Sequence, residues 1–209
     1  MPTHATLTAI TDSRVIGIIR RRTAEEAIAD VKRLIRVGVR AIEVSLSTPR
    51  AIEVIAAVAP SAGDDLHLGI GTVLAARDVE LAKAAGASFI VSPISKAEVI
   101  DAARDHGLVR VLGVMTPTEC FTAADNGADL LKLFPASLWP LKSMRGLLAA
   151  LPALRLVPTG GVTLDASSTW LEAGAVAVGL GSSLTKVSSD EVLQRGIGAL
   201  ARPGREERR

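Results

Sequence analysis

Two ionisable residues stand inside apolar segments that are typical of buried strands. Lys132 lies in LLKLFPA (130–136), and Glu43 lies in AIEVSL (41–46). Burying an unpaired charge is costly, so such residues are paired, neutralised or used in chemistry. Burial lowers the pKa of a lysine ammonium, and the free amine attacks carbonyl groups while a nearby carboxylate moves protons. The pair therefore predicts amine catalysis, with a purely structural Glu43–Lys132 salt bridge as the alternative.

Two glycine-rich segments have the composition of a phosphate-binding site. PTGGV (158–162) and GLGSSL (179–184) each end an apolar run. Glycines allow backbone N–H groups to approach an anion closely, and Ser182 or Ser183 can add a hydroxyl group and begin a helix. The two segments together predict a phosphorylated substrate, and the choice between the two serines stays open.

The remaining charged and nucleophilic residues give weaker signals. Arg20 ends the apolar run VIGIIR (15–20) and is a third charge near the predicted site, whereas Arg21 and Arg22 are expected to be exposed. Cys120 has no partner in the sequence that would mark it as a nucleophile. A metal site is not predicted, because the sequence has no zinc-binding motif and its histidines are scattered: His4, His67 and His106.

Eight short apolar runs alternate with segments of helical periodicity. The runs begin roughly 20–26 residues apart, which is the length of one strand–helix unit. A glycine ends many of the helical segments: Gly38, Gly86, Gly107, Gly127 and Gly174. This pattern predicts an α/β protein, a (β/α)8 TIM barrel with a short N-terminal helix (3–12), whose active site lies at the carboxyl ends of the strands. An open doubly wound sheet is the alternative, although no G-x-G-x-x-G motif follows the first run.

Composition limits the class of protein further. The chain has 209 residues, 48% of them hydrophobic and 22% charged, which fits one barrel domain (1–201) and a disordered basic tail (202–209). The net charge of +2 resides in that tail and aromatic residues make up 2%, so nucleic-acid binding is not expected. Since no apolar run is long enough to span a membrane and no secretory signal pattern is present, we expect a cytoplasmic protein.

Several segments, in this order and spacing, resemble the 2-keto-3-deoxy-6-phosphogluconate (KDPG) aldolase family: GIIR, AIEVSL, GIGTVL, FIVSP, GVMTPTE, LKLFPA, PTGGV and GLGSSL. The resemblance extends from Val15 to Leu184. Members of this family are class I aldolases on (β/α)8 barrels, usually homotrimers, and they need no metal or other cofactor. The resemblance implies cleavage of KDPG to pyruvate and glyceraldehyde 3-phosphate, as in the Entner–Doudoroff pathway, and leaves open an activity on 4-hydroxy-2-oxoglutarate (KHG).

The resemblance also implies roles for individual residues. Lys132 matches the Schiff-base lysine and Glu43 the catalytic glutamate of the family. The residues that match the walls of the pyruvyl pocket are Thr72, Pro93 and Phe134. Those that match the phosphate-binding positions are Gly160, Gly161, Gly181 and Ser182.

At one substrate-binding position the chain differs from some members of the family. The resemblance also leaves open which of two epimeric substrates the chain uses. Some members carry a substrate-binding arginine four residues after the glutamate, where this chain has Ser47. Others end the first strand with an arginine, so Arg20 is assigned to the substrate carboxylate. Thr159 favours the gluconate substrate over the galactonate epimer, which is the alternative. More distant alternatives are a sugar-phosphate isomerase or epimerase and a non-catalytic barrel that senses a phosphorylated ligand.

Overall fold

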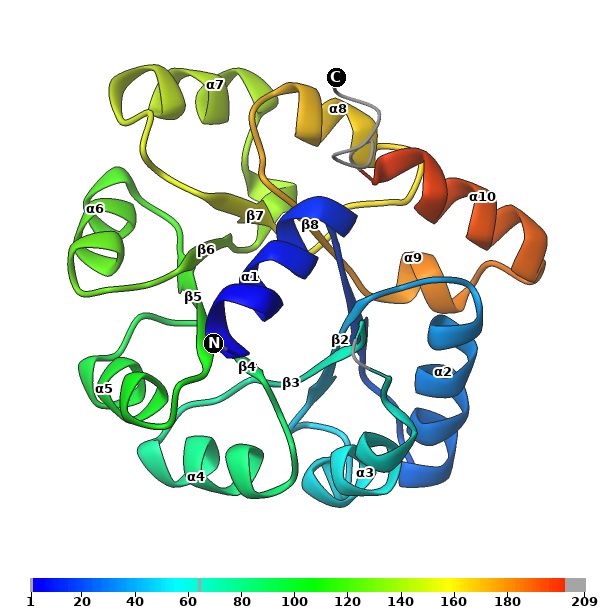
Figure 1. Cartoon of the computed structure of the whole chain (residues 1–209). Helices are drawn as coiled ribbons and strands as arrows, with labels where there is room; N and C mark the ends of the chain where they lie inside the picture. Colours follow the sequence, from blue (N-terminus) through cyan, green and yellow to red (C-terminus); the bar gives the residue numbers. More distant parts are fainter. Residues whose placement is uncertain (1, 64, 202–209) are drawn as a thin grey trace.

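Eight parallel strands coincide with the eight predicted apolar runs. The computed structural model describes residues 2–63 and 65–201 (Figure 1). Neighbouring strands pair in the order β7-β6-β5-β4-β3-β2-β1-β8. Their bounds are β1 (Val15–Ile19), β2 (Ala41–Ser45), β3 (His67–Gly71), β4 (Phe89–Val91), β5 (Val109–Val114), β6 (Leu130–Leu133), β7 (Leu156–Pro158) and β8 (Val178–Leu180).

Two backbone contacts join β7 to β8 and bring the ends of the sheet together. The N–H of Val176 donates a hydrogen bond to the carbonyl of Leu156 (3.0 Å). Thr159 forms an isolated parallel bridge with Gly179, directly after β7. The sheet is therefore a nearly closed barrel, as predicted, and the alternative of an open doubly wound sheet is wrong.

Helices surround the barrel and begin and end where the sequence indicates (Figure 1). Thr23 caps the helix after β1 by accepting a hydrogen bond from the N–H of Glu26 (3.2 Å). The predicted helix-ending glycines all have positive φ, a conformation that glycine adopts without a Cβ clash. The helices are α1 (Pro2–Ser13), α2 (Ala24–Arg36), α3 (Ala51–Val58), α4 (Ala76–Ala84), α5 (Ala97–Asp105), α6 (Pro117–Asp125), α7 (Leu141–Ala150), α8 (Ser167–Glu172), α9 (Ser182–Thr185) and α10 (Asp190–Leu200).

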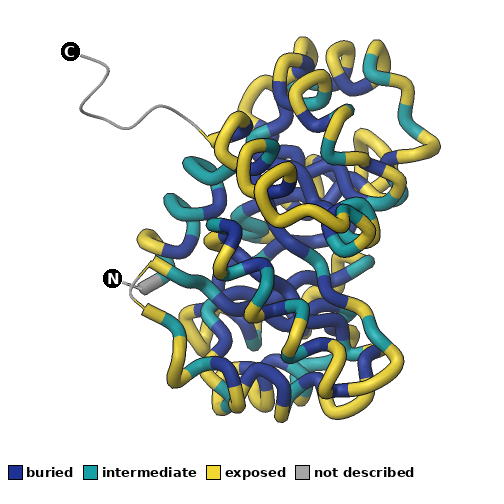
Figure 2. Tube along the Cα trace, turned by 90° about the vertical axis from the view of Figure 1, so that its right-hand side faces the viewer, coloured by how far each residue is buried: buried dark blue, intermediate teal, exposed yellow. Residues whose placement is uncertain are grey.

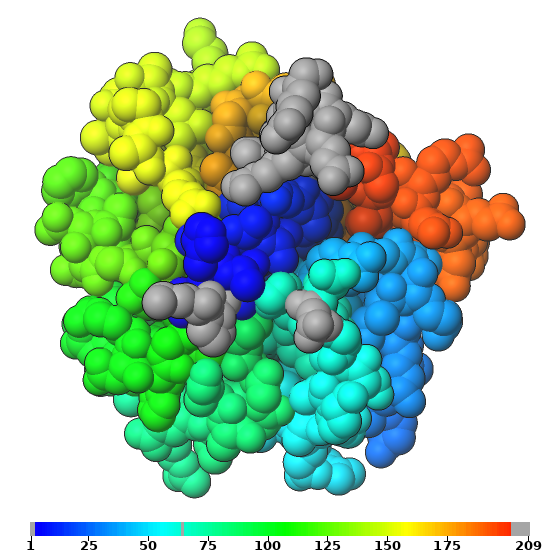
Figure 3. All heavy atoms as spheres, viewed as in Figure 1, coloured from blue at the N-terminus to red at the C-terminus, as the bar shows by residue number. Residues whose placement is uncertain are grey.

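Helix α1 covers the N-terminal end of the barrel, as expected for the helix predicted at 3–12. Figure 1 shows it lying across this opening, and Figure 3 shows its side chains filling the centre of the same face. Ile10 of α1 is fully buried and belongs to one apolar cluster with residues that point into the barrel, among them Ile16, Phe89 and Val111. The interior is therefore closed at this end, and a ligand can reach it only from the carboxyl ends of the strands.

A second, larger apolar cluster fills the layer between the outer face of the sheet and the helices. Figure 2 shows buried chain along the strands and exposed chain on the outward faces of the helices. None of the helices within residues 2–63 and 65–201 is long and apolar enough to cross a membrane. The basic tail predicted at 202–209 lies outside the described residues.

Candidate active site

A cavity of about 550 Å³ opens at the carboxyl ends of the strands. Of the residues predicted for the site, all but Thr72 and Pro93 line it. They come from β2 and β6 and from the segments that follow β1, β6, β7 and β8. The lining residues that the sequence predicts are Arg20, Glu43, Lys132, Phe134, Thr159, Gly160, Gly161, Gly181 and Ser182.

The amine of Lys132 lies at the floor of this cavity. The residue is the third of β6, is 7% exposed and pairs with Gly113 of β5 and Val157 of β7. Its Nζ atom lies 4.9 Å from the centre of the Phe134 ring, a cation–π contact. Within the part of the chain that the structure describes, no carboxylate forms a salt bridge with Lys132. The structural alternative of a direct Glu43–Lys132 salt bridge is therefore wrong.

Glu43 supplies a buried carboxyl group to the same cavity. It is 2% exposed at the middle of β2, opposite Ile18 of β1 and Gly69 of β3. Its Oε2 atom has no hydrogen-bond partner among the described residues. Burial raises the pKa of Glu43, while the positive charges of Lys132 and Arg20 act in the opposite direction. A carboxyl group whose pKa is raised in this way can both release and accept a proton at intermediate pH.

A glycine at the end of β3 makes room for this carboxyl group. Any Cβ atom on Gly71 would collide with the Glu43 side chain. Thr72 follows with φ 63°, an uncommon conformation for a residue with a branched side chain. Its Oγ1 atom lies 2.8 Å from Ser45 Oγ, which lies 2.8 Å from Ser47 Oγ. These hydroxyl groups form a short chain beside Glu43, and the substrate contact implied for Thr72 stays a prediction.

Pro93 lies in a second, smaller cavity. This cavity measures about 180 Å³ and is lined by Pro93, Ile94, Met115 and Phe134, among others. Phe134 also lines the main cavity and so separates the two. The pyruvyl contact implied for Pro93 also stays a prediction.

The glycine-rich segments after β7 and β8 form one wall of the main cavity. Gly160 and Gly161 have φ of 88° and 87°, which only glycine adopts readily. A Cβ atom on Gly160 would lie 3.0 Å from the Phe134 ring, so the segment packs closely on the residue after β6. Gly181 precedes α9, a four-residue helix that places Ser182 and Ser183 at the cavity. Short helices after the eighth strand commonly bind phosphate in such barrels.

The structure corrects one expectation and adds residues that sequence reasoning missed. Arg21 was expected in solvent, but it lines the cavity because Asp30 of α2 binds its Nε atom and Thr48 accepts a hydrogen bond from its N–H (3.1 Å). Arg22 is exposed, as expected. The polar neighbours of Lys186 in the sequence indicate a solvent-exposed residue. It is exposed, but it also lines the cavity, four residues after Ser182 and hence on the same side of a helical turn. Two further residues with hydroxyl groups line this wall without having been predicted from the sequence: Thr163 and Thr185.

The other reactive residues take no part in the cavity. Cys120 is fully buried on α6, and burial raises the pKa of its thiol to about 11, which keeps it protonated and unreactive. In the described ranges, histidine, cysteine and acidic side chains form no group of three that could hold a metal ion.

The fold and the site are those of a known class of enzyme. Residues 7–196 match the family model described as KDPG and KHG aldolase. The chain is 37% identical over 171 residues to the 2-dehydro-3-deoxy-6-phosphogalactonate aldolase of Escherichia coli, covering 81% of this chain and 83% of that one. It is 38% identical over 153 residues to the 2-dehydro-3-deoxy-phosphogluconate aldolase of Treponema pallidum, covering 73% and 72%.

A solved structure agrees with this relationship at the level of the fold. The KDPG aldolase of Zymomonas mobilis superposes with a TM-score of 0.82 at 24% identity, covering 94% of this chain and 96% of that one. The protein is thus an aldolase, a carbon–carbon lyase built on a TIM barrel. Within that class it belongs to the KDPG and KHG aldolase family, which confirms the resemblance drawn from the sequence segments.

The raised pKa of Glu43 predicts a distinct dependence of stability on pH. A carboxyl group whose pKa is higher in the folded than in the unfolded state stabilises the fold at low pH, and this contribution is lost as pH rises. We expect the free energy of unfolding of the wild type, measured relative to Glu43→Gln, to fall as pH rises from about 4 towards neutrality. Urea titrations at a series of pH values measure it.

Glu53 provides the control with the opposite sign. A hydrogen bond from Arg50 lowers the pKa of this exposed carboxyl group, so its contribution is lost as pH falls. The free energy of unfolding of the wild type, measured relative to Glu53→Gln, should therefore rise slightly as pH rises. If the free energy of unfolding of the wild type relative to Glu43→Gln stays constant or rises with pH, the assignment of Glu43 as a desolvated carboxyl group is wrong.

Proposed function

We propose that this chain is a class I aldolase that cleaves KDPG to pyruvate and glyceraldehyde 3-phosphate through a Schiff base on Lys132. The observation that carries the proposal is the buried amine of Lys132, which faces an open cavity and has no carboxylate bound to it. An amine in this setting is available to a carbonyl group, and Glu43 lies in the same cavity to move protons. An isomerase or epimerase would have no need of such a lysine.

The reaction follows from these two groups. The neutral Lys132 amine attacks the C2 ketone of the substrate, and the protonated Glu43 carboxyl group gives its proton to the departing oxygen, so that water leaves and a protonated imine remains. The Glu43 carboxylate takes the proton of the C4 hydroxyl group, the C3–C4 bond breaks, and its electron pair moves to the imine nitrogen to give an enamine. Glyceraldehyde 3-phosphate leaves, and Glu43 returns the proton to C3. Water then hydrolyses the protonated imine to release pyruvate and the free amine, and Glu43 takes back the remaining proton.

The two ends of the substrate carry negative charge, and the cavity offers a partner for each. Arg20, which directly follows β1, lines the cavity and is assigned to the carboxylate of the pyruvyl group. The segments with Gly160, Gly161, Gly181 and Ser182 are assigned to the phosphate, which backbone N–H groups bind well. Binding at the phosphate orients the reacting carbon atoms, so loss of the phosphate should lower turnover as well as affinity.

A trapping experiment tests the Schiff base. Incubation with pyruvate and sodium borohydride should leave a stable pyruvyl adduct, which mass spectrometry of the intact chain and its peptides locates on Lys132. Lys132→Arg should give no adduct and no turnover, because a guanidinium stays protonated and forms no imine. Lys142→Arg on the exposed face of α7 is the matched control and should keep both. A folded wild type without an adduct would refute the proposed mechanism.

Thr159 supports the gluconate epimer as the preferred substrate. The two epimers differ at the C4 hydroxyl group, next to the bond that breaks. Thr159 is buried at the cavity wall, and its hydroxyl group donates to the carbonyl of Val157 (3.1 Å), which leaves its oxygen free to accept a hydrogen bond from the substrate. Since relatives named for each epimer match this chain, the family alone leaves the choice open.

The preference can be measured as a ratio. We expect kcat/KM for KDPG to exceed that for the galactonate epimer, and Thr159→Val to lower the ratio about 5- to 10-fold, the worth of one hydrogen bond. Thr163→Val, on the outer wall of the same cavity, should leave the ratio unchanged. A wild type that prefers the galactonate epimer would reverse the substrate assignment and leave the aldolase chemistry intact. Turnover of KHG is compatible with the same imine and belongs in the same assay.

An apolar arc on the active-site face supports association of several copies. Large apolar side chains that follow successive strands β3 to β6 are 37–63% exposed: Leu74, Ile94, Met115, Phe134 and Leu138. Ile94, Met115 and Phe134 line one small cavity together, and clustered exposed apolar side chains mark protein interfaces. We propose that copies of the chain associate through this arc as the homotrimer that the family resemblance implies.

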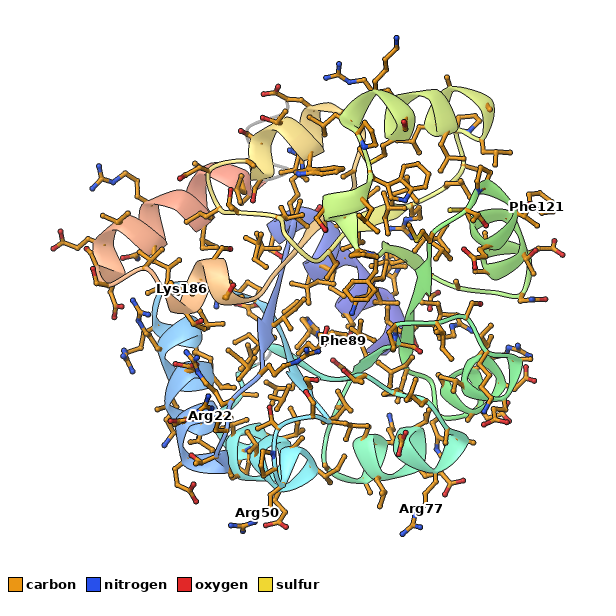
Figure 4. All side chains as sticks on the ribbon, turned by 180° about the vertical axis from the view of Figure 1, so that it is seen from behind. Arg22, Arg50, Arg77, Phe89, Phe121 and Lys186 are labelled. Atoms are coloured by element: carbon orange, nitrogen blue, oxygen red, sulfur yellow. The ribbon has the colours of Figure 1, made fainter. Side chains whose placement is uncertain are left out.

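Light scattering with size exclusion chromatography measures the assembly. The wild type should have the mass of three chains, and Ile94→Glu with Met115→Glu should reduce it to that of one. Phe121→Glu is the control, because Phe121 is 58% exposed on α6 and Figure 4 shows it at the periphery of the molecule. A wild type that runs as a single chain would exclude the trimer.

A further inference from the structure

The cavity carries more positive charge than the proposed reaction uses. Besides Lys132 and Arg20, two further cationic side chains line it: Arg21, the second residue after β1, and Lys186, directly after α9. Glu43 is the one carboxylate among the described residues that line the cavity. The excess positive charge lies on the same wall as the glycine-rich segments, where the proposed function puts the phosphate.

Arg21 is held in place on two sides. Its Nε atom donates to Asp30 of α2, and this ion pair is partly buried, with 33% and 17% of the two side chains exposed. Its backbone N–H donates to Thr48 in the segment after β2 (3.1 Å). One edge of the guanidinium is thus fixed by the protein, and a planar guanidinium has further N–H donors for a second anion.

Lys186 approaches the same wall from the other end of the chain. The backbone N–H of Lys186 donates a hydrogen bond to the carbonyl of Ser182 (3.0 Å), so the residue continues the turn of α9. Its side chain is exposed and forms no salt bridge with any carboxylate that the structure describes. Figure 4 views the active-site face and places Lys186 where α9 and α2 are neighbours.

An unsatisfied hydroxyl group on α9 supports a ligand at this wall of the cavity. The Oγ atom of Ser183 is buried, lines the cavity wall with its residue, and has no hydrogen-bond partner among the described residues. Buried polar atoms are nearly always hydrogen-bonded, so such an atom at a cavity indicates a partner supplied by a ligand. This observation does not depend on the charges of Arg21 and Lys186.

We propose that Arg21 and Lys186 form a cationic clamp on the phosphate of the substrate and give this enzyme its selectivity for phosphorylated aldehydes. The inference rests on the proposed function, because it takes the phosphate to lie at the glycine-rich wall. Backbone N–H groups supply geometry but little net charge, whereas two cations attract a phosphate dianion in proportion to its charge. A neutral aldehyde of the same length gains nothing from them.

Three measurements on Arg21→Gln, Lys186→Gln and the double variant test the clamp. The first is the Kd of inorganic phosphate by calorimetry, the second is KM for KDPG, and the third is the yield of the borohydride-trapped pyruvyl adduct. Each single variant should weaken phosphate binding and raise KM about 3- to 10-fold, with a larger effect in the double variant than in either single variant. Trapping of pyruvate, and its condensation with unphosphorylated glyceraldehyde, should stay within about 2-fold of the wild type, because neither ligand has a phosphate.

Two matched variants and the pattern of results make the outcome decisive. Arg22→Gln, at the exposed arginine next to Arg21, and Lys142→Gln should leave all three measurements unchanged. Should Arg21→Gln fail to fold for want of its partner on α2, the exposed Lys186 still carries the test. The clamp would be overturned if the double variant bound phosphate as tightly as the wild type. It would also be overturned if the yield of the trapped pyruvyl adduct fell by the same factor as the affinity for phosphate.

The same data separate this inference from the proposed function. A wild type that traps no pyruvate refutes the Schiff-base mechanism, yet weaker phosphate binding in the variants would still support the clamp. A wild type that cleaves KDPG, together with variants of unchanged KM, supports the mechanism and refutes the clamp.

Discussion

Two ionisable side chains are held out of water in the upper part of a barrel whose lower part is filled with apolar side chains. Lys132 and Glu43 face the same cavity without a salt bridge between them, and burial raises the pKa of Glu43. Such an arrangement costs stability, because unpaired buried charges are unfavourable, and the rest of the fold must offset that cost. The nearly closed barrel, the plug formed by α1 and the space left at Gly71 keep these two groups in place.

The barrel and the centre of its site could be predicted because each depends on local sequence. Strand-length apolar runs at regular spacing identify the eight strands, and glycines at helix ends mark where each unit closes. Lys132 and Glu43 stood out because a charge in an apolar strand violates the pattern around it. The glycine-rich wall of the cavity could be predicted because its glycines cluster at the ends of two successive apolar runs, and the ends of neighbouring parallel strands lie side by side.

What could not be predicted depends on contacts between distant residues. Whether Arg21 faces solvent or the cavity is decided by Asp30 on α2 and by Thr48 after β2, neither of which the run of arginines reveals. Thr72 adopts a positive φ that its residue type disfavours, and its hydroxyl group lies beside Ser45. The exposed apolar arc likewise became visible only once successive strand ends were seen to share one face.

The closure of one end of the barrel by α1 has a consequence for the order of events in the proposed reaction. Substrate, both products and the water that hydrolyses the imine share a single route, through the mouth at the carboxyl ends of the strands. The pyruvyl half is bonded to Lys132 at the floor, and the half with the phosphate lies nearer the rim. The aldehyde therefore blocks the path of the hydrolytic water until it departs. Release is sequential by geometry, aldehyde first and pyruvate second, and a high concentration of the aldehyde returns the enamine to substrate before water can reach it.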